Sequence, residues 1–206
     1  QEVTQRLFDW KPSLLVFSDK DSLSMMKTGV INSIILLFAA QITTILFCIV
    51  FFKLITSKRL IVHAASKATA IFLLNAPTIF LLILGYLITS TLTTYNGALA
   101  LGMAAIVIGL GEGATGGYSL YEASKTIGSD AGLLQSLKFA RVRIRACLIT
   151  AAQCCPIAAF IGAPELMSSM TDITAFTGER VTTLTLLAIF YATAIQVIIV
   201  ITNLLF

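Results

Sequence analysis

The side chain with the clearest chemical potential is Glu112, which lies inside a glycine-rich run between Gly109 and Gly113. An acidic residue within an apolar, membrane-spanning stretch is costly and is by default a functional candidate. Glu112 could meet a cationic solute or a cytoplasmic arginine. The simpler alternative is that it lies at the wet end of its helix and only forms an ion pair.

Other reactive residue types do not assemble into a catalytic or metal-binding set. His63 is the only histidine, and it lies in a basic stretch where we expect it to be solvated. The cysteines fit no zinc or disulfide spacing and are expected to be small packing residues in apolar surroundings: Cys48, Cys147, Cys154 and Cys155. We therefore expect no enzyme activity, no metal and no cofactor held by this chain.

The elements that would position Glu112 are long apolar stretches. Hydrophobic residues make up 57% of the 206-residue chain, charged residues make up 12%, and the mean hydropathy is +0.93. A spanning helix needs roughly 20 mostly apolar residues. The sequence predicts an all-α polytopic bundle of about five spans in one membrane domain, 29–206, after an interfacial arm at 1–28. The predicted spans are about 30–52, 69–89, 97–117, 146–163 and 181–206.

The distribution of charge predicts the orientation of the bundle. The 53–67 loop has four Lys/Arg and no acid, and the 118–145 loop has five Lys/Arg and two acids. The 90–96 link has no charge, and the 164–180 link has one Arg and three acids. Cytoplasmic loops carry the excess of Lys/Arg. The first and third loops are therefore predicted to be cytoplasmic, with the N-terminus outside and the C-terminus inside.

Glycines recur every fourth residue in the third predicted span, at Gly109, Gly113 and Gly117, and Gly102 extends the pattern. Such a face lets helix backbones approach closely in a membrane. We predict helix packing at these positions. A phosphate-binding loop is excluded because no strand precedes the glycines and no Lys-Ser/Thr pair follows them.

The longest predicted cytoplasmic loop contains Glu122-Ala123-Ser124-Lys125-Thr126-Ile127-Gly128. A short helix with one exposed face could dock there in a groove on a partner, and the glycine would let the chain turn away. Further along, Arg141, Arg143 and Arg145 alternate with apolar residues. They are typical of a cytoplasmic boundary anchor whose side chains reach lipid phosphates, and the basic surface is too small to predict nucleic-acid binding.

Three stretches resemble the permease subunits of ATP-binding-cassette (ABC) importers of the polar amino-acid uptake type. Residues 122–128 resemble the family's Glu-Ala-Ala-x-x-x-Gly loop motif, and Leu-Leu-Gln-Ser-Leu-Lys at 133–138 resembles Leu-Pro-Gln-Ala-Leu-Arg. The segment 153–166, which ends in Ile-Gly-Ala-Pro-Glu-Leu, resembles the family stretch that ends in Ile-Gly-Val-Pro-Glu-Leu. The chain departs from the family in a shorter segment between the first two motifs and in Leu134 in place of the family's proline.

The resemblance implies a permease that forms part of a solute pathway, for amino acids, in the bacterial inner membrane. Two cytoplasmic ATPase subunits would bind ATP and Mg²⁺, a second permease, identical or homologous, would complete the pathway, and an external binding protein would deliver the solute. The ATPase would contact Glu122, Ala123, Ser124 and Gly128. Polar residues expected to face the bundle interior are candidates for the solute pathway: Asn75, Glu112, Thr150, Gln153 and Glu165.

Two readings from other classes stay open. The chain could be a non-transporting membrane subunit that anchors a multiprotein complex through its glycine face and basic loops. It could also be a proton-coupled secondary carrier, although only Glu112 is plausibly within the membrane and no inverted repeat is visible.

Overall fold

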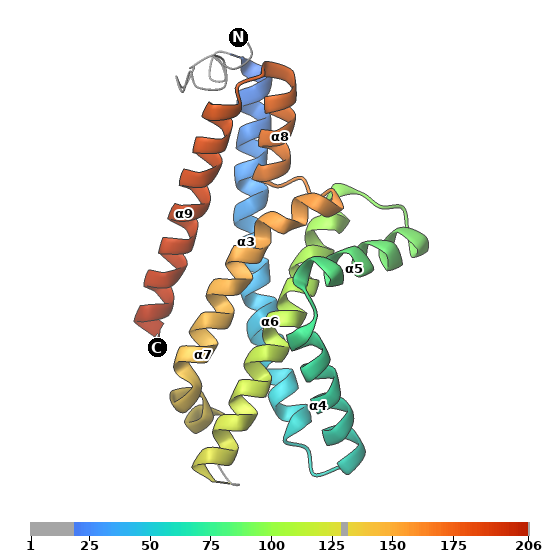
Figure 1. Cartoon of the computed structure of the whole chain (residues 1–206), viewed down its shortest axis with the longest axis vertical. Coiled ribbons are helices and arrows are strands. Elements are labelled where there is room, and N and C mark those ends of the chain that lie inside the picture. The colour runs from blue at the N-terminus through green and yellow to red at the C-terminus, as the bar shows by residue number, and fades with distance from the viewer. Residues whose placement is uncertain (1–18, 129–131, 206) are drawn as a thin grey trace, which may run out of the picture.

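A computed structural model describes residues 19–128 and 132–205 (Figure 1). Within these ranges every regular element is a helix, which confirms the predicted all-α class. The elements, in chain order, are α3 (Lys20–Ile55), α4 (Leu60–Asn75), α5 (Thr78–Leu92), α6 (Gly97–Ile127), α7 (Leu133–Cys154), the 3₁₀ helix η1 (Cys155–Ile161), α8 (Leu166–Thr177) and α9 (Arg180–Leu205). Most of the predicted interfacial arm, residues 1–18, lies outside the described residues.

Four of the described elements are long and apolar enough to cross a membrane: α3, α6, the continuous Leu133–Ile161 stretch of α7 and η1, and α9. Helices α4 and α5 together form a fifth candidate span that is bent by 110°. The polytopic bundle of about five spans is therefore confirmed as a helical architecture.

The predicted span at 69–89 is not one continuous helix in the structure. Ala76 has an extended backbone (φ −80°, ψ 129°) and Pro77 begins a new helix in a different direction. Proline has no N–H for the helix ladder, and its ring disfavours helical geometry at the preceding residue. Helix α5 consequently lies across the long axis of the bundle, whereas α4 runs more nearly along it (Figure 1).

The predicted basic loops are mostly helical. The 53–67 segment contains only a short connection, 56–59, between α3 and α4, and the 118–145 segment is divided between α6 and α7. The 164–180 link contains the 12-residue helix α8. Charge marks where a segment meets water, but it does not end a helix, because long basic side chains extend away from the apolar part. The α3–α4 and α6–α7 connections lie at the same end of the bundle (Figure 1).

Helix α3 begins ten residues before the predicted first span because Asp19 caps it. The Asp19 carboxylate accepts hydrogen bonds from the backbone N–H of Ser22 at 3.0 Å and from the Ser22 hydroxyl at 2.6 Å. An N-cap carboxylate satisfies N–H groups that have no partner in the helix and interacts favourably with the helix dipole. The cap therefore allows the 36-residue helix α3 to begin at Lys20, in a polar part of the sequence.

The close pairing of α3 and α6 forms the centre of the bundle. A Cβ atom at Gly109 would lie 2.1 Å from Thr43 Oγ1, one at Gly113 would lie 2.8 Å from the carbonyl oxygen of Thr44, and one at Gly117 would lie 2.6 Å from Phe51 Cβ. The backbones approach because these glycines have no side chain. Thr43 uses the approach to donate a hydrogen bond to the carbonyl of Ala105 at 2.7 Å.

Gly102 takes no part in this close contact, contrary to the sequence prediction. It is exposed, and no atom lies within 4 Å of a Cβ built there. Gly102 lies seven residues before Gly109, at nearly the same angular position on α6, so the spacing alone does not separate it from the contact.

Candidate functional site

The break between α4 and α5 brings two of the predicted pathway residues, Asn75 and Glu112, to one pocket. The pocket has a volume of about 280 Å³ and lies where the break meets α6. Its lining combines a carboxylate, an amide and two hydroxyls with aliphatic groups. The lining residues are Leu73, Leu74, Asn75, Ala76, Pro77, Thr78, Leu81, Gly111, Glu112 and Thr115.

Glu112 is the middle residue of the 31-residue helix α6. Its carboxylate has no hydrogen bond or ion pair with any residue in 19–128 or 132–205. The ion pair that the simpler alternative required is therefore not formed within the described chain, and neither is a pairing with one of its arginines. The sequence missed the position of Glu112 in its helix because α6 continues ten residues beyond the predicted end of the span.

Two polar neighbours of Glu112 donate hydrogen bonds within their own helices. Asn75 donates one of its two side-chain N–H groups to the carbonyl of Ile71 at 2.7 Å, and Thr115 donates its hydroxyl to the carbonyl of Gly111 at 3.1 Å. The Asn75 amide oxygen and the Thr115 hydroxyl oxygen remain as acceptors. The pocket is consequently rich in hydrogen-bond acceptors.

Two other predicted pathway residues, Thr150 and Gln153, do not line this pocket. Thr150 is half-buried on α7, and Gln153 is exposed near the end of the same helix. Asn75 is also exposed, although it lines the pocket. The role of these residues in the solute pathway stays a prediction. Helix α7 contacts α5 through Cys154, whose thiol lies 3.8 Å from the hydroxyl of the pocket residue Thr78.

Glu165 is fully buried, and its carboxylate is saturated by donors from its own surroundings. It accepts the backbone N–H groups of Met167 at 2.9 Å and Ser168 at 3.0 Å, and so caps α8. The Ser33 hydroxyl of α3 donates to it at 3.3 Å, and the Tyr191 hydroxyl of α9 donates a short hydrogen bond. With these partners in place, Glu165 joins three helices, and no oxygen is left to bind a solute.

Sequence reasoning missed Ser33 and Tyr191 as members of this network. Ser33 also accepts the backbone N–H of Leu166 at 2.8 Å, so it contacts both the cap residue and the first residue of α8. The sequence did contain a signal for these two residues, a hydroxyl group in each of two apolar spans. Buried polar groups in a membrane need hydrogen-bond partners. The sequence separation of more than 100 residues hid the pairing of Ser33 with Glu165.

The predicted ATPase-contact segment 122–128 forms the last turns of α6 rather than a separate short helix. Ala123 and Ser124 are buried, whereas Glu122 is exposed. Gly128 ends the helix with a φ of +142°, a conformation that favours glycine. The predicted short docking helix is therefore wrong in this structure, because the segment keeps the helical hydrogen bonds of α6.

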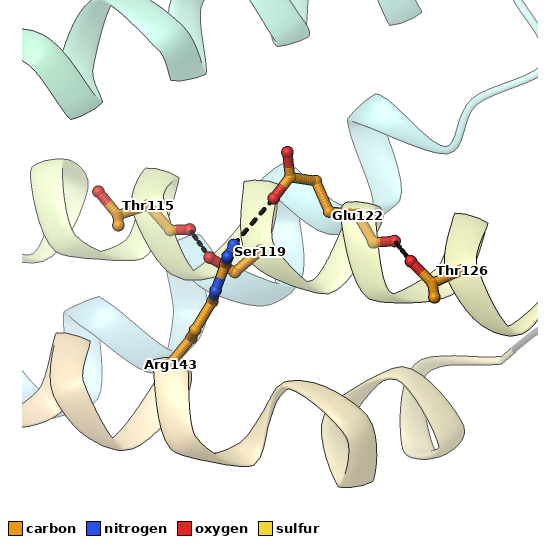
Figure 2. A network of polar contacts seen from close by, with 5 residues as sticks. All are labelled: Thr115, Ser119, Glu122, Thr126 and Arg143. Carbon is orange, nitrogen blue, oxygen red and sulfur yellow. Dashed lines mark hydrogen bonds and ion pairs between the residues drawn. The ribbon is translucent and has the colours of Figure 1, made fainter.

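Figure 2 shows how this end of α6 is fixed to α7. Glu122 and Arg143 form an ion pair with an N–O distance of 2.9 Å, and their side chains are 46% and 67% exposed. Ser119 and Thr126 donate to carbonyls one turn earlier on α6, at Thr115 and Glu122. The ion pair is solvent-exposed, so it contributes little to the free energy of unfolding. Its main effect is to place a carboxylate and a guanidinium together at the basic end of the bundle.

A larger cavity, of about 720 Å³, lies between α3 and α9. Apolar side chains such as Phe38, Phe190 and Val197 line it, and none of the lining residues within 19–128 and 132–205 is charged. The cavity offers no polar group array for recognition of a polar solute, so we place the candidate site at Glu112.

A solved structure shares this arrangement of helices. The chain superimposes on it with a TM-score of 0.71 and 14% identity, over 95% of this chain and 98% of that chain. That structure is described as the crystal structure of an amino acid ABC transporter with histidines. The chain has the fold of an amino acid ABC transporter chain. No family model matches the sequence, and no curated protein matches it.

Proposed function

We propose that the chain is the transmembrane permease subunit of an ATP-driven ABC importer, and that amino acids are its solutes. The observation that carries the proposal is the fold shared with an amino acid ABC transporter over 95% of the chain. The sequence motifs near 122–138 and 153–166 support the same family. In this proposal the chain performs no bond chemistry, and partner subunits bind ATP and Mg²⁺.

The proposed complex contains two cytoplasmic ATPase subunits, a second permease that is identical or homologous, and an external solute-binding protein. Its proposed location is the bacterial cytoplasmic membrane. The excess of Lys/Arg near the α3–α4 and α6–α7 connections supports a cytoplasmic position for that end of the bundle. The N-terminus would then lie outside and the C-terminus inside.

Helix α6 supplies a mechanical route between the two proposed sites. Glu112 in the pocket and Glu122 at the ATPase end lie on the same continuous helix, roughly 15 Å apart along its axis at about 1.5 Å per residue. Closure of the ATPase pair would move the end of α6 and α7 as a unit. The pocket would move with it in a rigid-body switch between inward-facing and outward-facing states.

Purification from the native membrane tests this function. We expect the tagged chain, extracted in mild detergent, to retain a nucleotide-binding ATPase and a second permease, both identified by mass. A stable native complex without an ATPase would contradict the importer proposal. The same experiment establishes whether the second permease is a copy of this chain.

A paired substitution tests the proposed contact segment. Gly128→Ala places a side chain at a φ of +142°, whereas Gly132→Ala changes the other side of the same connection at an ordinary φ of −72°. A side chain is strained only in the first case. We expect Gly128→Ala to reduce ATPase co-purification and Gly132→Ala to preserve it; equal retention by both variants would contradict a role for the α6 terminus.

One observation favours a second candidate function, a non-transporting membrane subunit. The 122–128 segment has no helix of its own that could seat in a partner's groove, because it is continuous with α6. A native complex that contains other membrane proteins, but no ATPase, would support this candidate.

A further inference from the structure

We propose that the pocket between the α4–α5 break and α6 binds the ammonium or guanidinium group of a small organic cation, with Glu112 as its counter-ion. This inference rests on the proposed importer function, because it takes the bound cation to be the transported solute. Binding itself can be measured without transport, so the two proposals can fail separately.

The charge of the pocket is the first reason. Among the described residues Glu112 is the only charged one in the lining, and no basic side chain of those residues pairs with it. A carboxylate in the middle of a spanning helix is unfavourable unless a proton or a cation compensates it. A cationic ligand would supply the missing partner through a charge-assisted hydrogen bond, the stronger class of such bonds.

The end of α4 adds further acceptors. Pro77 has no N–H to donate to the carbonyl of Leu73, and the 110° bend carries the following N–H groups into a new helix. The C-terminus of a helix carries partial negative charge from its unpaired carbonyls. Broken membrane helices use such carbonyls to coordinate cations in many transporters. The C-terminal end of α4 therefore favours a cationic ligand, as Glu112 does, whereas the N-terminal end of α5 at the same break carries the opposite partial charge.

The side chains around Glu112 agree with this charge. One of the two side-chain N–H groups of Asn75 and the hydroxyl hydrogen of Thr115 are already donated to the carbonyls of Ile71 and Gly111. Their oxygens can accept the several N–H groups of an ammonium or guanidinium. An anionic ligand would meet the carboxylate and these acceptors without a basic partner.

The size of the pocket favours an organic cation over a bare inorganic ion. Hard metal ions are held by oxygen ligands at about 2.3–2.6 Å, which needs a tight cage, whereas this pocket measures about 280 Å³. That volume is close to the lower end, roughly 300 Å³, of small-molecule pockets. Leu73, Pro77 and Leu81 give it an aliphatic surface for the carbon chain of such a ligand.

The test compares L-arginine with L-citrulline, a neutral ligand of nearly the same shape, by calorimetry on the purified full-length chain in lipid nanodiscs. We expect arginine to bind at least about tenfold more tightly, because a charged hydrogen-bonded partner contributes about that factor. Glu112→Gln should remove this preference. Asp172→Asn, which neutralises an exposed carboxylate on α8 outside the pocket, should preserve it.

A second variant keeps the proposal testable if Glu112→Gln does not fold. Asn75→Asp keeps the size of the side chain and adds negative charge to the pocket lining, so it should increase arginine affinity. Thermal melting of each variant reports whether it is folded. A folded Glu112→Gln protein that binds arginine as the parent does, or an Asn75→Asp variant with no gain, would overturn the inference.

Two further outcomes separate the alternatives. If sodium chloride abolished arginine binding while potassium chloride at equal ionic strength did not, the site would be a selective inorganic cation site and the proposal would fail. If the native complex lacked an ATPase while Glu112-dependent arginine binding persisted, the importer function would fail and the binding site would stand.

Discussion

Tyr191 on α9 donates a short hydrogen bond to the buried carboxylate of Glu165, the residue that caps α8. Ser33 on α3 lies within 3.3 Å of both groups. The contact joins the last span of the chain to the first through the intervening helix. It explains why Glu165, although acidic and buried, is a structural group rather than a solute contact.

Removal of the Tyr191 hydroxyl should destabilise the bundle. Tyr191→Phe leaves the ring in place but takes one donor from a buried carboxylate, a loss of about 1–3 kcal/mol. Thermal unfolding in detergent would measure the change. Tyr86→Phe is the matched control, because this partly exposed tyrosine of α5 makes no hydroxyl hydrogen bond to any residue that the structure describes. It should change the melting temperature little; equal shifts in both variants would contradict the assignment.

Addition of a methyl group at the α3–α6 contact should also destabilise the protein. In Gly113→Ala the new Cβ would lie 2.5 Å from Phe47 Cβ and 2.8 Å from the Thr44 carbonyl oxygen, so the helices must separate. Overpacking of this kind costs about 1–3 kcal/mol. The measurement is the melting temperature of the purified variant in detergent.

Gly102→Ala is the control for this prediction because it lies on the same helix with open space around it. It should be neutral or stabilising by up to about 1 kcal/mol, since alanine has the higher helix propensity. A Gly113→Ala protein as stable as Gly102→Ala would show that α3 and α6 do not pack closely.

The cap at the start of α3 should depend on pH. The Ser22 hydroxyl and backbone N–H hold the pKa of Asp19 below its ordinary value of 3.8 by bonding to the charged form. A depressed pKa in the folded state means that the stabilisation is complete above the unfolded pKa. It is lost as the pH falls through the folded pKa.

The titration of Asp19 can be followed by the NMR shift of its labelled carboxyl carbon. We expect the midpoint to lie below 3.8 in the parent protein and to rise in Ser22→Ala, which removes the largest cause of the shift. A parent midpoint at or above the ordinary value would contradict the cap.

The Glu122–Arg143 ion pair should contribute little to stability. Because both side chains are largely exposed, we expect Arg143→Gln to change the free energy of unfolding by less than about 1 kcal/mol. Unfolding of the isolated chain at low and high salt would measure this. A large loss of stability would indicate that the pair is shielded from water, contrary to its exposure.

The sequence could predict the structural role of a residue where that role depends on neighbours within the same helix. The length of the apolar stretches predicted the helical bundle, since few other structures pair all backbone N–H and C=O groups inside a membrane. The four-residue spacing of Gly109, Gly113 and Gly117 predicted a close helix contact without naming its partner. The position of Glu112 among apolar residues marked it as a candidate, but the ion pair of its simpler alternative is not formed within the described residues.

The amino-acid sequence by itself determined the helical class, the approximate spans, the glycine face and the short list of polar groups at membrane depth. These depend on composition and on neighbours within one helical turn. Tertiary structure alone decided which polar groups have partners. Glu165 receives Ser33 and Tyr191 from distant helices, whereas Glu112 faces a pocket made by the bend at Pro77. Two acids that look alike in the sequence acquire different roles because burial and hydrogen-bond donors come from segments far along the chain.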